Sequence, residues 1–178
     1  MNPIATHPIT HPILDAFNSA PEKDATTALL SCCASHRWSL ALVAARPFSS
    51  EEALFLAADQ VWAPMQEADW MEAFRAHPRI GERKPAEASA QSKAWSSGEQ
   101  AQVHAAQAAI LGEFAEGNRA YEQQFGFTYI VCATGKSAEE MLSILKRRLA
   151  SDRAAELREA AEQQRQITQI RLRKWLQR

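Results

Sequence analysis

The feature that most constrains the fold is a single run of residues with strong β-strand character. Residues 128–133 read TYIVCA and are rich in β-branched and aromatic side chains, between a turn at Gly126 and another at Gly135. A strand needs a partner to pair with, and we find no second run of this kind in the sequence. We therefore expect these residues to form an extended buried segment rather than part of a sheet, within an all-α fold.

Most of the remaining chain shows helical periodicity, interrupted by prolines, glycines and capping residues. The pattern predicts a compact bundle of about eight helices. We expect residues 1–12 to form an extended N-terminal arm, followed by one helical domain over residues 13–178. The expected helices cover residues 13–19, 25–35, 37–45, 51–62, 67–76, 97–114 (with a possible continuation to 124), 138–150 and 153 to the C-terminus.

Two Ser-x-x-Glu patterns have the form of capping boxes, in which the serine and the glutamate satisfy backbone N–H groups at a helix start. One joins Ser96 to Glu99 and the other joins Ser137 to Glu140. Residues 82–93 are polar and contain Pro85, which predicts a surface loop before the first of these boxes.

Composition excludes several classes of protein. The 178 residues carry a net charge of -1 with no basic block, which argues against a nucleic-acid partner. No apolar run reaches membrane-spanning length, and no signal peptide is visible at the N-terminus. The three cysteines lack the spacing of a disulfide framework, which indicates free thiols in a reducing compartment. We expect a cytoplasmic protein.

His77 stands at the end of an amphipathic helix, in the stretch FRAHPRIGE over residues 74–82. Pro78 disfavours helical geometry for His77, and Gly81 allows the chain to turn with positive φ. A histidine on such a corner is ordered and accessible, and its pKa lies near neutrality. The stretch alone is equally compatible with an ordinary helix end at which the histidine is incidental.

The last helix places a charged side chain on its inward face. An arginine there requires an anionic partner, because an unpaired buried guanidinium costs several kcal/mol. For Arg171 that partner is either an acidic side chain or the carboxylate of a ligand. The inward stripe consists of Leu157, Ala161, Gln164, Thr168, Arg171 and Trp175.

Four blocks in order resemble the 2-oxo-4-hydroxy-4-carboxy-5-ureidoimidazoline (OHCU) decarboxylase family, over about residues 25–175. They are residues 46–48 with 72–81 (RPF, then EAFRAHPRIG), residues 96–100 (SSGEQ), residues 118–133 (NRAYEQQFGFTYIVCA), and residues 147–149 with Glu156 and residues 167–172 (RRL, E, ITQIRL).

The resemblance implies an all-helical, usually dimeric carboxy-lyase that converts OHCU to (S)-allantoin in urate breakdown without a cofactor or metal. It assigns His77 as the catalytic acid/base and implies catalytic roles for Glu99 and Arg171. Substrate contacts are expected from Pro78, Ser96, Gln100, Tyr129, Ile130, Val131, Cys132 and Ala133, the last five through an extended segment that lends backbone groups to the ligand.

Two other readings predict different behaviour. A helical module could bind a ureide or purine metabolite without turning it over, which would give saturable binding and no product. A scaffold for partner helices would use the stripe from Leu157 to Trp175 as an interface, and changing Arg171 would then affect association only. Two alternative roles are open for Glu99. Its side chain either caps its helix or faces a pocket, because it cannot do both at once.

Overall fold

The computed structural model describes residues 11–82, 90–104 and 108–178, and within them every regular element is a helix. The predicted extended arm lies almost entirely outside the described residues, as does most of the polar stretch that follows the His77 corner. The helices are α1 (Pro12–Ser19), α2 (Glu22–Leu30), α3 (His36–Ala44), α4 (Glu51–Trp62), α5 (Glu67–Arg75), α6 (Ala90–Glu99), α7 (Ala101–His104), α8 (Ala108–Phe125), α9 (Ala138–Arg148) and α10 (Arg153–Leu176).

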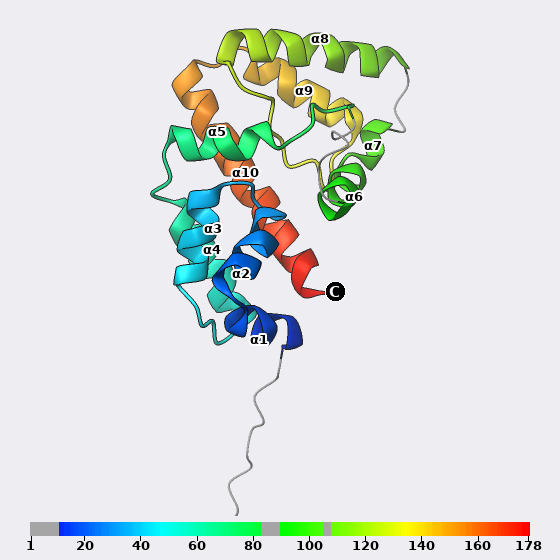
Figure 1. The fold of residues 1–178 in the computed structure, drawn as a ribbon. Coiled ribbons are helices and arrows are strands. Elements are labelled where there is room, and N and C mark those ends of the chain that lie inside the picture. Colours follow the sequence, from blue (N-terminus) through cyan, green and yellow to red (C-terminus); the bar gives the residue numbers. More distant parts are fainter. Residues whose placement is uncertain (1–10, 83–89, 105–107) are drawn as a thin grey trace, which may run out of the picture.

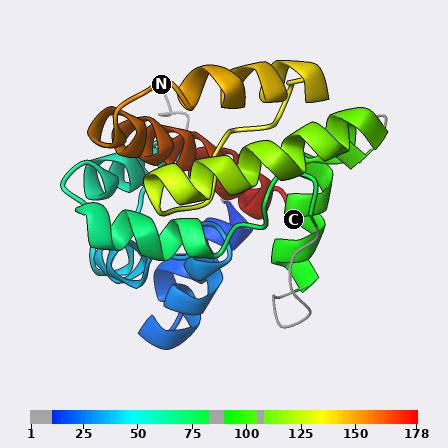
Figure 2. The same cartoon turned by 90° about the horizontal axis from the view of Figure 1, so that it is seen from above.

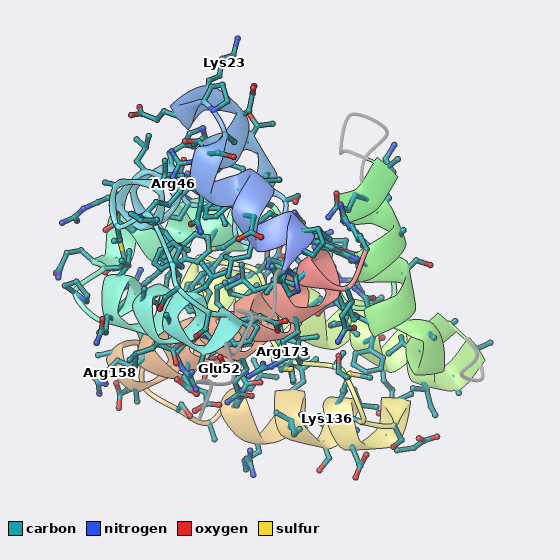
Figure 3. All side chains as sticks on the ribbon, turned by 90° about the horizontal axis from the view of Figure 1, so that it is seen from below. Lys23, Arg46, Glu52, Lys136, Arg158 and Arg173 are labelled. Atoms are coloured by element: carbon teal, nitrogen blue, oxygen red, sulfur yellow. The ribbon has the colours of Figure 1, made fainter. Side chains whose placement is uncertain are left out.

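Helix α10 runs through the middle of the molecule (Figure 1), in contact with α4, α5 and α8. The predicted inward stripe of α10 is buried along its length, which confirms the helical period inferred for it. Trp62 of α4 fixes one of these contacts, because its indole Nε1 donates to the backbone oxygen of Ala161 at 3.1 Å. Charged side chains such as Lys23 and Arg158 point outward at the periphery (Figure 3).

Local capping explains where two of these helices begin. Asp152 precedes α10 and accepts from the backbone N–H of Ala155 at 2.9 Å. Ser137 and Glu140 form the predicted capping box of α9, each accepting from the backbone N–H of the other.

The run of β-type residues is extended and buried, as predicted, and pairs with no strand among the described residues. It crosses between α8 and α9 as a thin yellow trace in Figure 2. Arg148 secures it by donating from Nη1 to the carbonyl of Ile130 at 2.7 Å. The same guanidinium pairs with the buried carboxylate of Glu156, to which the hydroxyl of Tyr121 also donates.

Two helix predictions, one capping box and one loop prediction were wrong. Residues 97–114 do not form one helix, because α6 ends at Glu99, Gln100 is in a turn and α7 begins at Ala101. Ser96 and Glu99 lie in the last turn of α6, so they do not cap a helix start. Residues 82–93 were predicted to form a loop, but the chain is helical from Ala90 onwards. The helix predicted over residues 25–35 begins earlier, at Glu22, and ends at Leu30.

Candidate active site

A small pocket lies where four parts of the chain meet. They are the corner after α5, the end of α6, the extended segment and the middle of α10. Among the described residues the pocket is lined by His77, Pro78, Ile80, Ser96, Glu99, Gln100, Tyr129, Ile130, Val131, Ala133 and Ile167. Segments far apart in the sequence thus bring most of the predicted site residues together.

The corner that carries His77 is fixed by several backbone hydrogen bonds. The N–H of His77 donates to the carbonyl of Phe74 at 3.0 Å, which closes the last turn of α5. Gly81 has φ of +91°, as its place in the turn predicted. Its N–H donates to Gln100 Oε1 at 2.9 Å, and the buried Asn118 donates from Nδ2 to the carbonyl of Ile80 at 2.9 Å. The histidine is therefore held on an ordered backbone.

The imidazole of His77 is bonded to a side chain that sequence reasoning did not include in the site. Its Nε2 lies 2.8 Å from Oε1 of Gln164 on α10. Gln164 in turn donates from Nε2 to Oγ1 of Thr168 at 3.2 Å, and the Thr168 hydroxyl donates to the backbone carbonyl of Gln164 at 2.9 Å. The requirement that a buried polar group be satisfied, applied in the sequence to Arg171 alone, holds equally for these two residues on the same stripe.

Glu99 and Arg171 form a bidentate ion pair beside the pocket. Nε and Nη2 of Arg171 donate to Oε1 and Oε2 of Glu99 at 2.9 and 2.7 Å. The side chains are 4% exposed for Arg171 and 10% for Glu99. The partner of the inward arginine is thus an acidic side chain. Glu99 faces the pocket, whereas Arg171 lies behind it and is not among the lining residues.

Ser96 and Gln100 lie on either side of Glu99 at the end of α6, and both are buried. The Oγ of Ser96 has no hydrogen-bond partner among the described residues, and Ser96 is one of the residues that line the pocket. Gln100 uses its side-chain oxygen to hold the corner at Gly81. A buried hydroxyl without a partner is a group that a ligand can satisfy.

Four of the five predicted residues of the extended segment line the pocket, and Cys132 does not. The backbone of Cys132 is engaged within the protein on both sides. Its N–H donates to Gln163 Oε1 at 2.8 Å, and its carbonyl accepts from Lys136 Nζ at 2.8 Å. Burial raises the pKa of the Cys132 thiol, so the group is neutral at physiological pH and a poor nucleophile.

Arg79 and Glu82 belong to the same corner as the histidine. Arg79 is bound to α8, with Nε and Nη2 donating to Glu122 at 2.8 and 2.6 Å. This pair ties the corner to the rest of the bundle. No cluster of three or more His, Cys, Asp or Glu residues in the described ranges is arranged to hold a metal ion.

Comparison with known proteins places this pocket in a family. The family model described as OHCU decarboxylase matches residues 18–173, which is most of the chain. The chain belongs to the OHCU decarboxylase family. The family expected from the four sequence blocks is thereby confirmed.

Relatives of this OHCU decarboxylase family member include proteins of known structure. A crystal structure of OHCU decarboxylase in the presence of (S)-allantoin superposes with a TM-score of 0.74 at 30% identity, covering 89% of this chain and all of that one. A crystal structure of (S)-allantoin synthase gives a TM-score of 0.66 at 20% identity, covering 91% and 53%, and supports the fold.

A curated relative is the uric acid degradation bifunctional protein TTL of Arabidopsis thaliana. It is 36% identical over 144 residues, which cover 80% of this chain and 44% of that protein. The chain therefore spans less than half the length of the curated relative that it matches.

Proposed function

We propose that this chain converts OHCU to (S)-allantoin without a cofactor, in the pocket lined by His77 and Glu99. The observation that carries the proposal is that a histidine on a rigid corner shares a small pocket with an arginine-held carboxylate. The family assignment supports OHCU as the substrate, and the relative solved in the presence of (S)-allantoin supports that product.

The chemistry asks for few protein groups. The bond between the ring carbon and the carboxylate breaks, CO2 leaves, and the electron pair moves into the conjugated ring imine. A proton must then be returned to one face of the ring. A positioned acid/base contributes about 10²–10⁴-fold to such a step. His77 is the acid/base in this proposal, and delivery from one side gives the product its handedness.

Glu99 and Arg171 act as a unit in this proposal. The carboxylate in the pocket favours the protonated imidazole, which is the form that delivers the proton. Arg171 fixes the direction of that carboxylate through two parallel hydrogen bonds.

The remaining lining residues bind the substrate. Ser96 offers a buried hydroxyl, and the extended segment that lines the pocket offers backbone amide groups that a helix would not. Both suit a ureido group, which carries N–H donors and a carbonyl acceptor.

The test is the handedness of the product, because OHCU decays spontaneously to racemic allantoin. Freshly generated OHCU is mixed with the enzyme and circular dichroism is followed. His77→Ala should abolish the enantiomeric excess while leaving the helical spectrum intact. His36→Ala is the matched control, since His36 is an exposed histidine that pairs with Glu72 far from the pocket lining. Full activity in His77→Ala would overturn the proposal, and saturable binding of allantoin without turnover by the unmodified chain would favour a binding module.

Two further expectations belong to the proposal. We propose a homodimer, which light scattering after size exclusion would measure directly. We also propose a cytoplasmic location, on the basis of the cysteine content. Among the described residues, none of the helices combines the length and apolar character that crossing a bilayer requires.

A further inference from the structure

We infer that Gln164 and Thr168 are positioning residues that set the tautomer of the His77 imidazole, an inference that rests on the proposed function. Gln164 is fully buried and Thr168 is 4% exposed. Neither lines the pocket, so neither is placed to touch a ligand. Their one route to the chemistry is through the ring of His77.

The orientation of the Gln164 amide follows from Thr168. The hydroxyl of Thr168 has one proton, and the backbone carbonyl of Gln164 lies 2.9 Å away as its acceptor. A hydroxyl oxygen whose proton is engaged in this way can only accept from the side-chain amide 3.2 Å away. The NH2 group of Gln164 therefore faces Thr168, and its oxygen faces His77.

The orientation of the amide then decides where the imidazole keeps its proton. The oxygen of Gln164 accepts only, so Nε2 of His77 at 2.8 Å must carry a hydrogen in both charge states of the ring. The tautomer with the proton on Nδ1 would bring two lone pairs together in a buried place. The proton that the ring gains and loses on titration is therefore the one on Nδ1.

A neutral amide is a different support from a carboxylate. A buried acid in the place of Gln164 would add a charge directly bonded to the ring, which favours imidazolium strongly. With glutamine at this position, one residue orients the imidazole and a different residue supplies the negative charge. Gln164 fixes the ring from α10, and the carboxylate of Glu99 comes from α6 on the pocket side. This division lets His77 lose its proton to the substrate and regain it.

Two variants of the full chain test the role by kinetics. Gln164→Met keeps the volume and removes the acceptor, and Thr168→Val keeps the shape and removes the hydroxyl. Each should lower kcat for optically active allantoin by about tenfold or more, with KM changed less than about twofold. Thr168→Ser restores the hydroxyl and should restore kcat. Gln166→Met is the matched control, because Gln166 bonds Glu162 on another face of α10.

The tautomer itself is read by ¹⁵N NMR of the ring, assigned by comparison with His77→Ala. The unmodified chain should show the proton on Nε2, and Thr168→Val should show a mixture of tautomers. Unchanged kcat in Gln164→Met, or a proton on Nδ1 in the unmodified chain, would overturn the inference. The NMR measurement still decides if Gln164→Met fails to fold. An unmodified chain that yields racemic allantoin would sink the proposed function alone, since the tautomer is measured without substrate.

Discussion

At the scale of single residues, two buried arginines of this molecule have different roles. Arg171 holds Glu99 at the edge of the pocket, where the pair can interact with a ligand. Arg148 is enclosed with Glu156, and its other hydrogen bonds go to the backbone carbonyl of Ile130 and the hydroxyl oxygen of Tyr121. Burial alone would lower the pKa of Arg148, but the bond to Glu156 and the neighbouring groups raise it, so it stays charged. The second pair supports the pocket without touching it.

Glu156→Gln should therefore be among the most damaging single changes outside the pocket. It keeps the shape of the side chain but leaves the Arg148 guanidinium buried without an anion, which costs about 3–5 kcal/mol. Urea unfolding followed by circular dichroism measures the change. Glu116→Gln, an exposed position on α8, is the control and should behave like the unmodified chain. Equal unfolding midpoints for the two variants would contradict this account of the buried pair.

The sequence identified candidate site residues where they interrupt a helical or apolar pattern. His77 stands between a helix end and a proline, and Arg171 is a charge on an apolar stripe, so both could be named. Gln164 was missed because it looks like an ordinary polar interruption of a helix. Its importance depends on what lies opposite, which is a residue 87 positions away. Pairings of that kind follow from tertiary packing and not from local propensity.

At the scale of elements, capping patterns were reliable only where the flanking sequence agreed with them. Ser137 and Glu140 follow a turn at Gly135, and they cap α9 as predicted. Ser96 and Glu99 have the same spacing but end a helix instead. In that position the two side chains are released from capping and become available to the pocket. The Ser-x-x-Glu pattern identifies the two side chains, and a turn directly before the serine determines whether they cap a helix.

The corner between α5 and α6 gives a test at this scale. Gly81→Ala places a side chain at φ +91°, which costs about 1–2 kcal/mol in backbone strain. Space is not the cause, because the new Cβ would meet its nearest neighbours, Leu111 and Val103, at ordinary distances of 3.8 and 3.9 Å. We expect a lower melting temperature and a lower kcat, since the corner carries His77. Gly98→Ala is the control, because its Cβ would have open space and no positive φ. A Gly81→Ala chain as stable as the control would refute the strain argument.

At the scale of the whole molecule, the all-α class could be predicted because one β-type run has nothing to pair with. The order of most helices was also readable, since prolines and caps mark their limits. The break at Gln100 between α6 and α7 was not readable, because the spacing of Ser96 and Glu99 has the form of a helix start, whereas α6 ends there. The chain bends there to bring the end of α6 against α10, and this gain is made only in the folded state.

The buried thiols and phenols predict how stability depends on pH. Burial raises the pKa of Cys32 from an ordinary value of 9.0 to about 12 and that of Cys33 to about 11. Burial also raises the pKa of Tyr121 and Tyr129. The folded chain holds these protons more tightly than the unfolded chain does. Their contribution is therefore fully present below pH about 9 and is lost as the pH rises towards 11–12.

The free energy of unfolding should accordingly be nearly level from pH 7 to 9 and fall steeply above that. Urea titrations at successive pH values, with a reducing agent present, give the curve. The variant with Cys32→Ala and Cys33→Ala should start lower, because it loses buried volume, but decline less steeply above pH 9. Parallel curves for the two proteins would show that these thiols do not titrate as their burial indicates.

The position of α10 carries a consequence for how this chain can change in length. Gln164, Ile167, Thr168 and Arg171 reach their partners because they share one face of a single helix. Inserting one residue ahead of them would turn the whole group by about 100° and carry it away from both His77 and Glu99. The surface turns can absorb added or missing residues, whereas α10 can do so only beyond its last site residue. The geometry of the site thus depends on the number of residues between these positions along α10. Insertions and deletions in that part of α10 are the length changes that this chain tolerates least.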